Sequence, residues 1–180
     1  MLFLELMRRF LCLLLFMNLL SLFARGASPL PVGAPAPRVT AQDQDGRTVD
    51  LAEVFARGGI TLVYFYPKAE TPGCTAEACS LRDAYDGLRG QGLQIIGVSR
   101  DSVAAQKKFR ENRKLPFTLL ADPDGKVAEA FGVALIPVVG LTTRQSFLIK
   151  EGKVAWSTQS AKTSGAAAEV QKALDTLQRQ

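Results

Sequence analysis

The 180-residue chain contains no histidine and only three cysteines. Both residue types are the usual ligands of zinc, so their scarcity argues against a metal centre. Of the formal net charge of +5, the N-terminal segment carries +2, and the +3 from Ala27 onward is spread without a basic run, which argues against nucleic-acid binding. Internal repeats and low-complexity tracts are also absent. With 47% hydrophobic and 22% charged residues, the chain has an ordinary globular composition and can bury the core of one domain.

The first 27 residues are predicted to lie outside this domain. The segment from Phe10 to Phe23 is apolar apart from Asn18 and Ser21, and it follows the basic pair Arg8-Arg9. A basic flank, an apolar core and then small residues are typical of a secretory signal peptide. Because the apolar run is shorter than the ~20 residues of a membrane-spanning helix, cleavage is favoured, and a retained N-terminal anchor is the alternative.

The remaining sequence is predicted to form a leader over residues 28–37 and one domain over residues 38–180. We expect export to the periplasm or an equivalent compartment, with membrane attachment only if the N-terminal segment is retained. Translation starts at Met1 or at Met7, and a start at Met7 gives the more typical beginning of a signal peptide.

Cleavage of the signal peptide removes Cys12 and leaves two cysteines, Cys74 and Cys79. Two cysteines in an exported protein usually pair. Five residues along a helix, however, set their Cα atoms roughly 8–9 Å apart, whereas a disulfide needs them within ~7 Å. The two can therefore join only if the helix is interrupted or unwinds, which fits a redox cycle better than a permanent structural disulfide.

Cys74 lies in a Thr-Pro-Gly-Cys turn at the predicted start of a helix, directly after an apolar strand. The amides of a helix N-terminus favour the thiolate form of a cysteine. Considered alone, Thr71 is more often a helix cap, Pro67 more often ends a strand, and Arg144 is more often a solvated surface charge.

Strands and helices alternate along the rest of the sequence, which predicts an α/β fold with a mixed central sheet flanked by helices. One helix is expected to run from Cys74 past Leu88 and to end before Gly90. The other expected elements are an N-terminal β-hairpin (39–51), strands (60–66, 93–98 and 117–121), helices (103–115, 127–131 and 165–180) and a late hairpin (146–157).

The sequence resembles a peroxiredoxin, and within that family the bacterioferritin comigratory protein (peroxiredoxin Q) group. Pro67-x-x-x-Thr71-x-x-Cys74 matches the family signature around the cysteine that attacks the peroxide, and Glu77 also matches. Cys79 occupies the position of this group's resolving cysteine. Further matches are Arg82-Asp83, GVSRDS (97–102), LPFTLLAD (115–122), FGV (131–133) and RQSFLI (144–149).

The resemblance implies a thioredoxin-like fold and an atypical two-cysteine peroxidase that needs no metal or cofactor. Cys74 would attack hydrogen peroxide or an organic hydroperoxide, and Cys79 would then close an intramolecular disulfide. An external thioredoxin-like protein would reduce that disulfide. Thr71 and Arg144 would hold the peroxide, Pro67 would screen the pocket from water, and Glu77 would orient the arginine.

The chain departs from the family pattern at two places. Arg38-Val39 replaces the usual Asp-Phe, and the region around Ala105-Gln106 lacks the histidine often found there. A thiol–disulfide oxidoreductase of the same fold is the alternative function, but such enzymes typically carry Cys-x-x-Cys. A non-catalytic binding module is the third. Intramolecular resolution needs no second subunit, so a monomer is favoured. The preferred peroxide and the natural reductant stay open.

Overall fold

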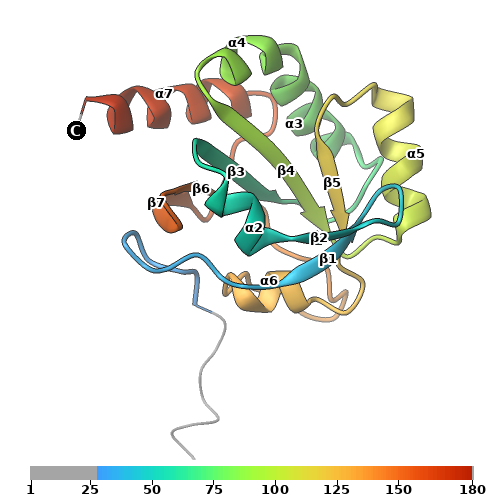
Figure 1. Cartoon of the computed structure of the whole chain (residues 1–180). Coiled ribbons are helices and arrows are strands. Elements are labelled where there is room, and N and C mark those ends of the chain that lie inside the picture. Colours follow the sequence, from blue (N-terminus) through green and yellow to red (C-terminus); the bar gives the residue numbers. More distant parts are fainter. Residues whose placement is uncertain (1–27, 180) are drawn as a thin grey trace, which may run out of the picture.

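The computed structural model describes residues 28–179, so the predictions for the N-terminal segment concern residues outside it. Seven strands form one mixed sheet in the order β2-β1-β5-β4-β3-β6-β7, with helices on both faces (Figure 1). The strands are β1 (Thr40–Asp43), β2 (Thr48–Asp50), β3 (Ile60–Phe65), β4 (Leu93–Ser99), β5 (Thr118–Ala121), β6 (Gln145–Lys150) and β7 (Lys153–Thr158). The helices are α2 (Leu51–Ala56), α3 (Pro72–Asp83), α4 (Tyr85–Gly90), α5 (Val103–Arg113), α6 (Lys126–Ala130) and α7 (Ala166–Gln178).

Strand β3 is an internal strand of the sheet and leads directly to the candidate site. It pairs in parallel with β4 and antiparallel with β6. Because successive side chains of a strand point to opposite faces, Tyr64 and Tyr66 pack into one core, while Val63 and Phe65 pack into the other. A continuous run of β-branched and aromatic residues is therefore buried on both sides, as expected for an internal strand.

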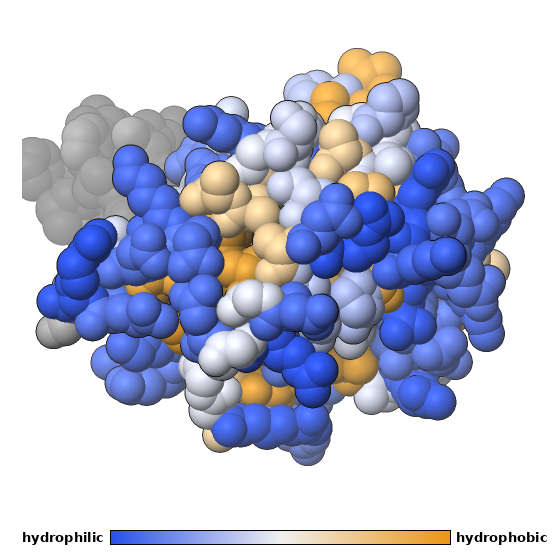
Figure 2. Space-filling model, turned by 90° about the horizontal axis from the view of Figure 1, so that it is seen from above, coloured by the Kyte–Doolittle hydropathy of each residue, from blue (hydrophilic) through white to orange (hydrophobic). Residues whose placement is uncertain are grey.

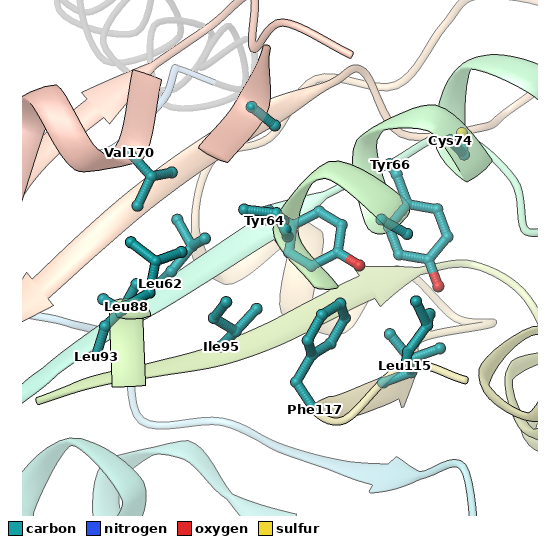
Figure 3. Close-up of a cluster of buried hydrophobic side chains, with 14 of the residues drawn as sticks. Leu62, Tyr64, Tyr66, Cys74, Leu88, Leu93, Ile95, Leu115, Phe117 and Val170 are labelled. Carbon is teal, nitrogen blue, oxygen red and sulfur yellow. The ribbon is translucent and has the colours of Figure 1, made fainter. Parts of the chain in front are cut away.

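The helices form two layers, and each layer covers one of the two cores. The first core lies under α3, α4, α5 and α7 and includes Cys74 (Figure 3). The second lies between the sheet and the helices α2 and α6. The thioredoxin-like α/β architecture, the mixed sheet and the N-terminal hairpin β1–β2 predicted from the sequence are all confirmed.

One local prediction was wrong, and one helix was not predicted. The helix after Cys74 is not continuous, because Ala84 leaves the helical conformation (φ −97°, ψ 1°) and separates α3 from α4. Leu81 and Leu88 bury in the same core on either side of this break, so the apolar spacing continues through it. Helix α2 was missed altogether. The Asp50 carboxylate accepts a hydrogen bond from the amide of Ala52 (2.8 Å) and so caps this helix.

The exposed surface carries few large hydrophobic side chains. Figure 2 shows a largely hydrophilic face, with hydrophobic residues in small separate patches. Among residues 28–179, the exposed large hydrophobic residues are Val32, Leu135, Val138 and Val139. Over the same range, no helix has the length and apolar character needed to cross a membrane.

Candidate active site

Cys74 lies in the first turn of α3, where the unpaired amides of a helix N-terminus are concentrated. The preceding loop brings the chain from the end of β3, and Pro72 begins the helix with its backbone already in a helical φ. Cys74 is 1% exposed and belongs to the core cluster that contains Tyr66. The sulfur is thus held in a mostly apolar environment next to a positive helix end.

Arg144 supplies a full positive charge at this sulfur. It directly precedes β6, and its Nη2 atom donates to Sγ of Cys74 at 3.4 Å. The side chain is only 18% exposed, so water screens its charge less than it would on the open surface. The structure therefore brings together two residues that are 70 positions apart in the sequence, as the family resemblance implies.

Glu77 holds the other side of the same guanidinium. It lies one turn after Cys74 in α3, is 1% exposed, and its Oε2 atom bonds to Nη1 of Arg144. Its second oxygen, Oε1, has no hydrogen-bond partner among the described residues. Burial raises the pKa of Glu77 to about 8, while Arg144 acts in the opposite direction. Burial tends to lower the pKa of Arg144, but Glu77 and Cys74 outweigh it and raise that pKa overall. The arginine therefore stays charged.

Thr71 is the N-cap residue of α3, with an extended backbone (φ −71°, ψ 151°). Its hydroxyl makes no capping bond to the helix and instead donates to the carbonyl of Lys68 at 2.9 Å. With the proton directed away, the lone pairs of the oxygen remain available as acceptors. Pro67 is half-buried and directly follows Tyr66, a buried residue just after the end of β3. The structure places both residues in the loop that leads into Cys74.

Contacts from three other elements fix the loop between β3 and α3. Asp101, just after β4, accepts hydrogen bonds from the Ala69 amide (2.8 Å) and the Ser99 hydroxyl (2.7 Å). Glu70 has a positive φ of 63° and binds Arg113 of α5 at 2.7 Å. At the root of the loop, a threonine before β6 donates to the carbonyl of Tyr66 (2.8 Å).

Sequence reasoning missed the buried polar network beneath this loop. Gln106 is completely buried and donates to the Ser99 hydroxyl (2.9 Å) and to the carbonyl of Leu120 (2.8 Å). Its own carbonyl oxygen accepts from the hydroxyl of Tyr66. The only sequence signal was a single glutamine at a core position of α5. Its partners are 7 to 40 residues away, so the sequence did not identify them.

Cys79 lies on the same unbroken helix as Cys74, and both thiols are free. The next residue, Ser80, accepts a hydrogen bond from the amide of Ala167 at the start of α7 (3.2 Å). The second half of α3 is thus bonded to another helix. In the state described here, the two cysteines occupy different turns of one regular helix.

Comparison with known proteins identifies the family. The sequence model of the AhpC/TSA family matches residues 32–157. The chain belongs to the AhpC/TSA family. Within these peroxiredoxins it groups with the Q/Bcp proteins. It is 43% identical over 122 residues to "Peroxiredoxin Q, chloroplastic" of Oryza sativa subsp. japonica, an alignment covering 68% of this chain and 55% of that protein. It is 47% identical over 106 residues to "Peroxiredoxin Bcp" of Escherichia coli (strain K12), covering 59% of this chain and 67% of that one.

Solved structures agree with this assignment. Peroxidoxin BcpB from Mycobacterium tuberculosis superposes with a TM-score of 0.74 at 32% identity, over 83% of this chain and 97% of that one. The bacterioferritin comigratory protein of Xanthomonas campestris, whose structure concerns alkyl peroxide reduction, gives 0.73 at 29% identity, over 82% and 97%. This peroxiredoxin therefore aligns with nearly whole solved chains, although its match spans about half the length of the plant relative.

Proposed function

We propose that this peroxiredoxin is a thiol-dependent peroxidase in which Cys74 reacts with the peroxide and Cys79 resolves the product. The observation that carries the proposal is the 3.4 Å contact between the Arg144 guanidinium and the Cys74 sulfur at the N-terminus of α3. The cation and the N-terminal amides of α3 attract negative charge, so they can stabilise the charge that develops when a peroxide reacts at this sulfur.

In the first step, the Cys74 thiolate attacks one peroxide oxygen and the O–O bond breaks. The sulfur becomes a sulfenic acid, and the departing oxygen takes up a proton and leaves as water or an alcohol. Negative charge develops on that oxygen. Arg144, whose Nη2 atom contacts the sulfur, and the backbone amide of Cys74 would stabilise this charge. Thr71 offers acceptor lone pairs to the peroxide proton, and Pro67 excludes water from one side of the pocket.

Glu77 acts through Arg144 and not on the peroxide. Its carboxyl group bonds Nη1 and leaves Nη2 directed at the sulfur. A long arginine side chain loses considerable rotamer entropy when it is fixed in one conformation. Because Glu77 already fixes Arg144 in the folded protein, this entropy is not lost again when the peroxide binds. Glu77 is therefore a positioning residue.

In the second step, the Cys79 thiol attacks the sulfenic sulfur, an S–S bond forms and water is released. The α3 helix must open locally for this step, because an intact helix keeps the two cysteines too far apart for a disulfide. A thioredoxin-like dithiol protein then reduces the disulfide by thiol–disulfide exchange. We further propose a monomer that is exported to an extracytoplasmic compartment.

Peroxide consumption with a generic dithiol tests these roles. Cys74→Ser is expected to abolish the reaction, whereas Cys79→Ser is expected to complete one turnover and then stall. After peroxide treatment, mass spectrometry should detect a Cys74–Cys79 link in the wild type. Intramolecular disulfide in the Cys79→Ser variant, or full turnover by Cys74→Ser, would refute the assignment. A thiol–disulfide oxidoreductase would instead reduce protein disulfides and fail to consume peroxide.

A further inference from the structure

A short hairpin with an apolar tip projects between α6 and β6. Residues 134–142 form it through bonds from the Ile136 amide to the Leu141 carbonyl (2.7 Å) and from the Gly140 amide back to the Ile136 carbonyl (3.0 Å). At the tip, Val138 is fully exposed and Val139 is 60% exposed. With Leu135, this hairpin carries three of the four exposed large hydrophobic residues in the described part of the chain.

The conformation of Val138 is costly for a valine. Its φ is +72°, in the left-handed region that favours glycine, and the adjoining amide of Val139 bonds to the carbonyl of Pro137 (2.9 Å). Positive φ is unfavourable for a β-branched residue. Neither core packing nor backbone stability explains why a valine occupies this strained and exposed position. A contact between its side chain and a surface outside the domain would explain it.

The base of the hairpin is bonded to the active site. Thr142 donates to the carbonyl of Tyr66 (2.8 Å), directly before Pro67, and Arg144 follows two residues later. On the other side, the Arg100 guanidinium donates to the Gly140 carbonyl at 2.6 Å. Val138 is four residues from Ala134 and four from Thr142, so the tip lies at most roughly 14 Å from the base of the hairpin. A surface touching the tip is therefore close to the peroxide pocket.

The N-terminal chain enters the domain at the start of the same hairpin. The Leu30 amide bonds to the carbonyl of Phe131 (3.1 Å), and Ser28 lies against Gly132. Gly132 is two residues before the hairpin. In the sequence, the apolar run Phe10 to Phe23 ends five residues before Ser28.

We propose that the N-terminal segment is retained as an anchor, the alternative to cleavage named above, and that the tip of hairpin 134–142 inserts into the surface of the same lipid bilayer. The occupant is lipid because the alternatives fit less well. Three side chains supply far less than the ~800 Å² per partner that a stable dimer buries. The run from Phe10 to Phe23 has 14 residues, of which only Asn18 and Ser21 are polar. A tip with three exposed apolar side chains is too small to cover it, whereas one bilayer accommodates both.

The tip and the N-terminal segment act as two membrane signals. A single acyl chain gives only marginal and reversible membrane binding, and the tip presents no more apolar surface than that. A tether attached at the root of the hairpin makes insertion of the tip an intramolecular event. The domain then stays oriented, with the pocket near peroxides carried in the bilayer. This last consequence rests on the proposed peroxidase function, but insertion of the tip does not.

The test uses the full-length chain in phosphatidylcholine–phosphatidylglycerol vesicles containing brominated lipid. Val138→Trp is compared with Thr176→Trp, an exposed position on α7, and the signal of Trp156 is subtracted from both. Quenching at the tip is expected to exceed that of the control at least about twofold, because brominated lipid reaches only inserted residues. Equal quenching, or membrane-bound protein that lacks residues 1–27, would overturn the proposal.

A second arm measures the rate with a phospholipid hydroperoxide in vesicles relative to the rate with H2O2. The ratio is expected to fall about fivefold or more when Val138→Asp and Val139→Asp are combined, because charged side chains are expelled from the bilayer. It should not change with Thr176→Asp. An unchanged ratio in the double variant, or a Val138-dependent dimer without lipid, would contradict the proposal. If the wild type consumes no H2O2, the proposed peroxidase function is refuted. The quenching experiment then still tests whether the hairpin tip inserts into the bilayer.

Discussion

Replacing Arg144 with glutamine is expected to slow the oxidation of Cys74 by H2O2 by about 10²–10³-fold, the usual cost of one donor that stabilises developing charge. The Nη2 atom lies 3.4 Å from the sulfur in a largely buried site. A charge pair at about 4 Å interacts by about 4 kcal/mol at an effective dielectric constant near 20, so an effect of this size is reasonable. Quenched-flow labelling of the sulfenic acid in a Cys79→Ser background measures this step alone.

The same substitution also destabilises the fold, and pH separates the two effects. Burial raises the pKa of Glu77 from 4.5 to about 8 in the folded state. The contribution of protonated Glu77 to the free energy of unfolding is therefore fully present below about pH 4.5, and it is lost as the pH rises towards about 8. Without Arg144 the pKa of Glu77 rises further, so the loss continues to higher pH. Arg144→Gln should cost little stability near pH 5 and at most about 3–5 kcal/mol at alkaline pH.

Glu77→Gln provides the matched control. Combined with Arg144→Gln, it removes the buried charge and should flatten the pH dependence of stability, measured by urea denaturation between about pH 5 and pH 9. The double variant should remain slow with H2O2. If Arg144→Gln oxidises Cys74 within about threefold of the wild-type rate, or if the double variant recovers activity along with stability, then Arg144 does not act at the reacting oxygen.

Three further substitutions test the surroundings of the site. Ser80→Ala removes the 3.2 Å hydrogen bond between α3 and α7. Because such a bond contributes about 1 kcal/mol, disulfide formation after oxidation should become about fivefold faster. Stopped-flow mixing measures that rate, and a slower rate would contradict the reasoning. Gln106→Leu leaves buried polar groups without partners and should cost about 2–4 kcal/mol in urea denaturation; a neutral result would show that the network contributes little. Gly132→Ala places a methyl group against Ser28 at a positive φ and should expose the leader to proteolysis; unchanged protection would mean that the leader is held elsewhere.

The sequence was sufficient for the strands that are buried on both sides, because an apolar β-branched run such as residues 60–66 has few other structures available. It also located Cys74 and Cys79 on one helix. The role of Arg144, however, came from resemblance. Nothing in the local sequence of an arginine reveals that its guanidinium will contact a sulfur 70 residues away.

Other features were beyond prediction because their causes are tertiary. The break at Ala84 has no glycine or proline to mark it, and the apolar spacing continues across it. Gln106 is a core residue only because hydroxyl and carbonyl partners from other elements surround it. The strained turn at Val138 follows from how the hairpin closes, since valine itself disfavours that conformation.

On the proposed mechanism, the position of both cysteines on one intact helix limits how much peroxide the protein can tolerate. Opening of α3 is a first-order event whose rate does not depend on the peroxide concentration. Further oxidation of the sulfenic acid to a sulfinic acid is second-order and irreversible without a dedicated repair enzyme. Above a threshold concentration, the second reaction overtakes the first. If Cys79 resolves the sulfenic acid as proposed, the bond between α3 and α7 adds to the barrier to opening and lowers the peroxide dose at which Cys74 is inactivated.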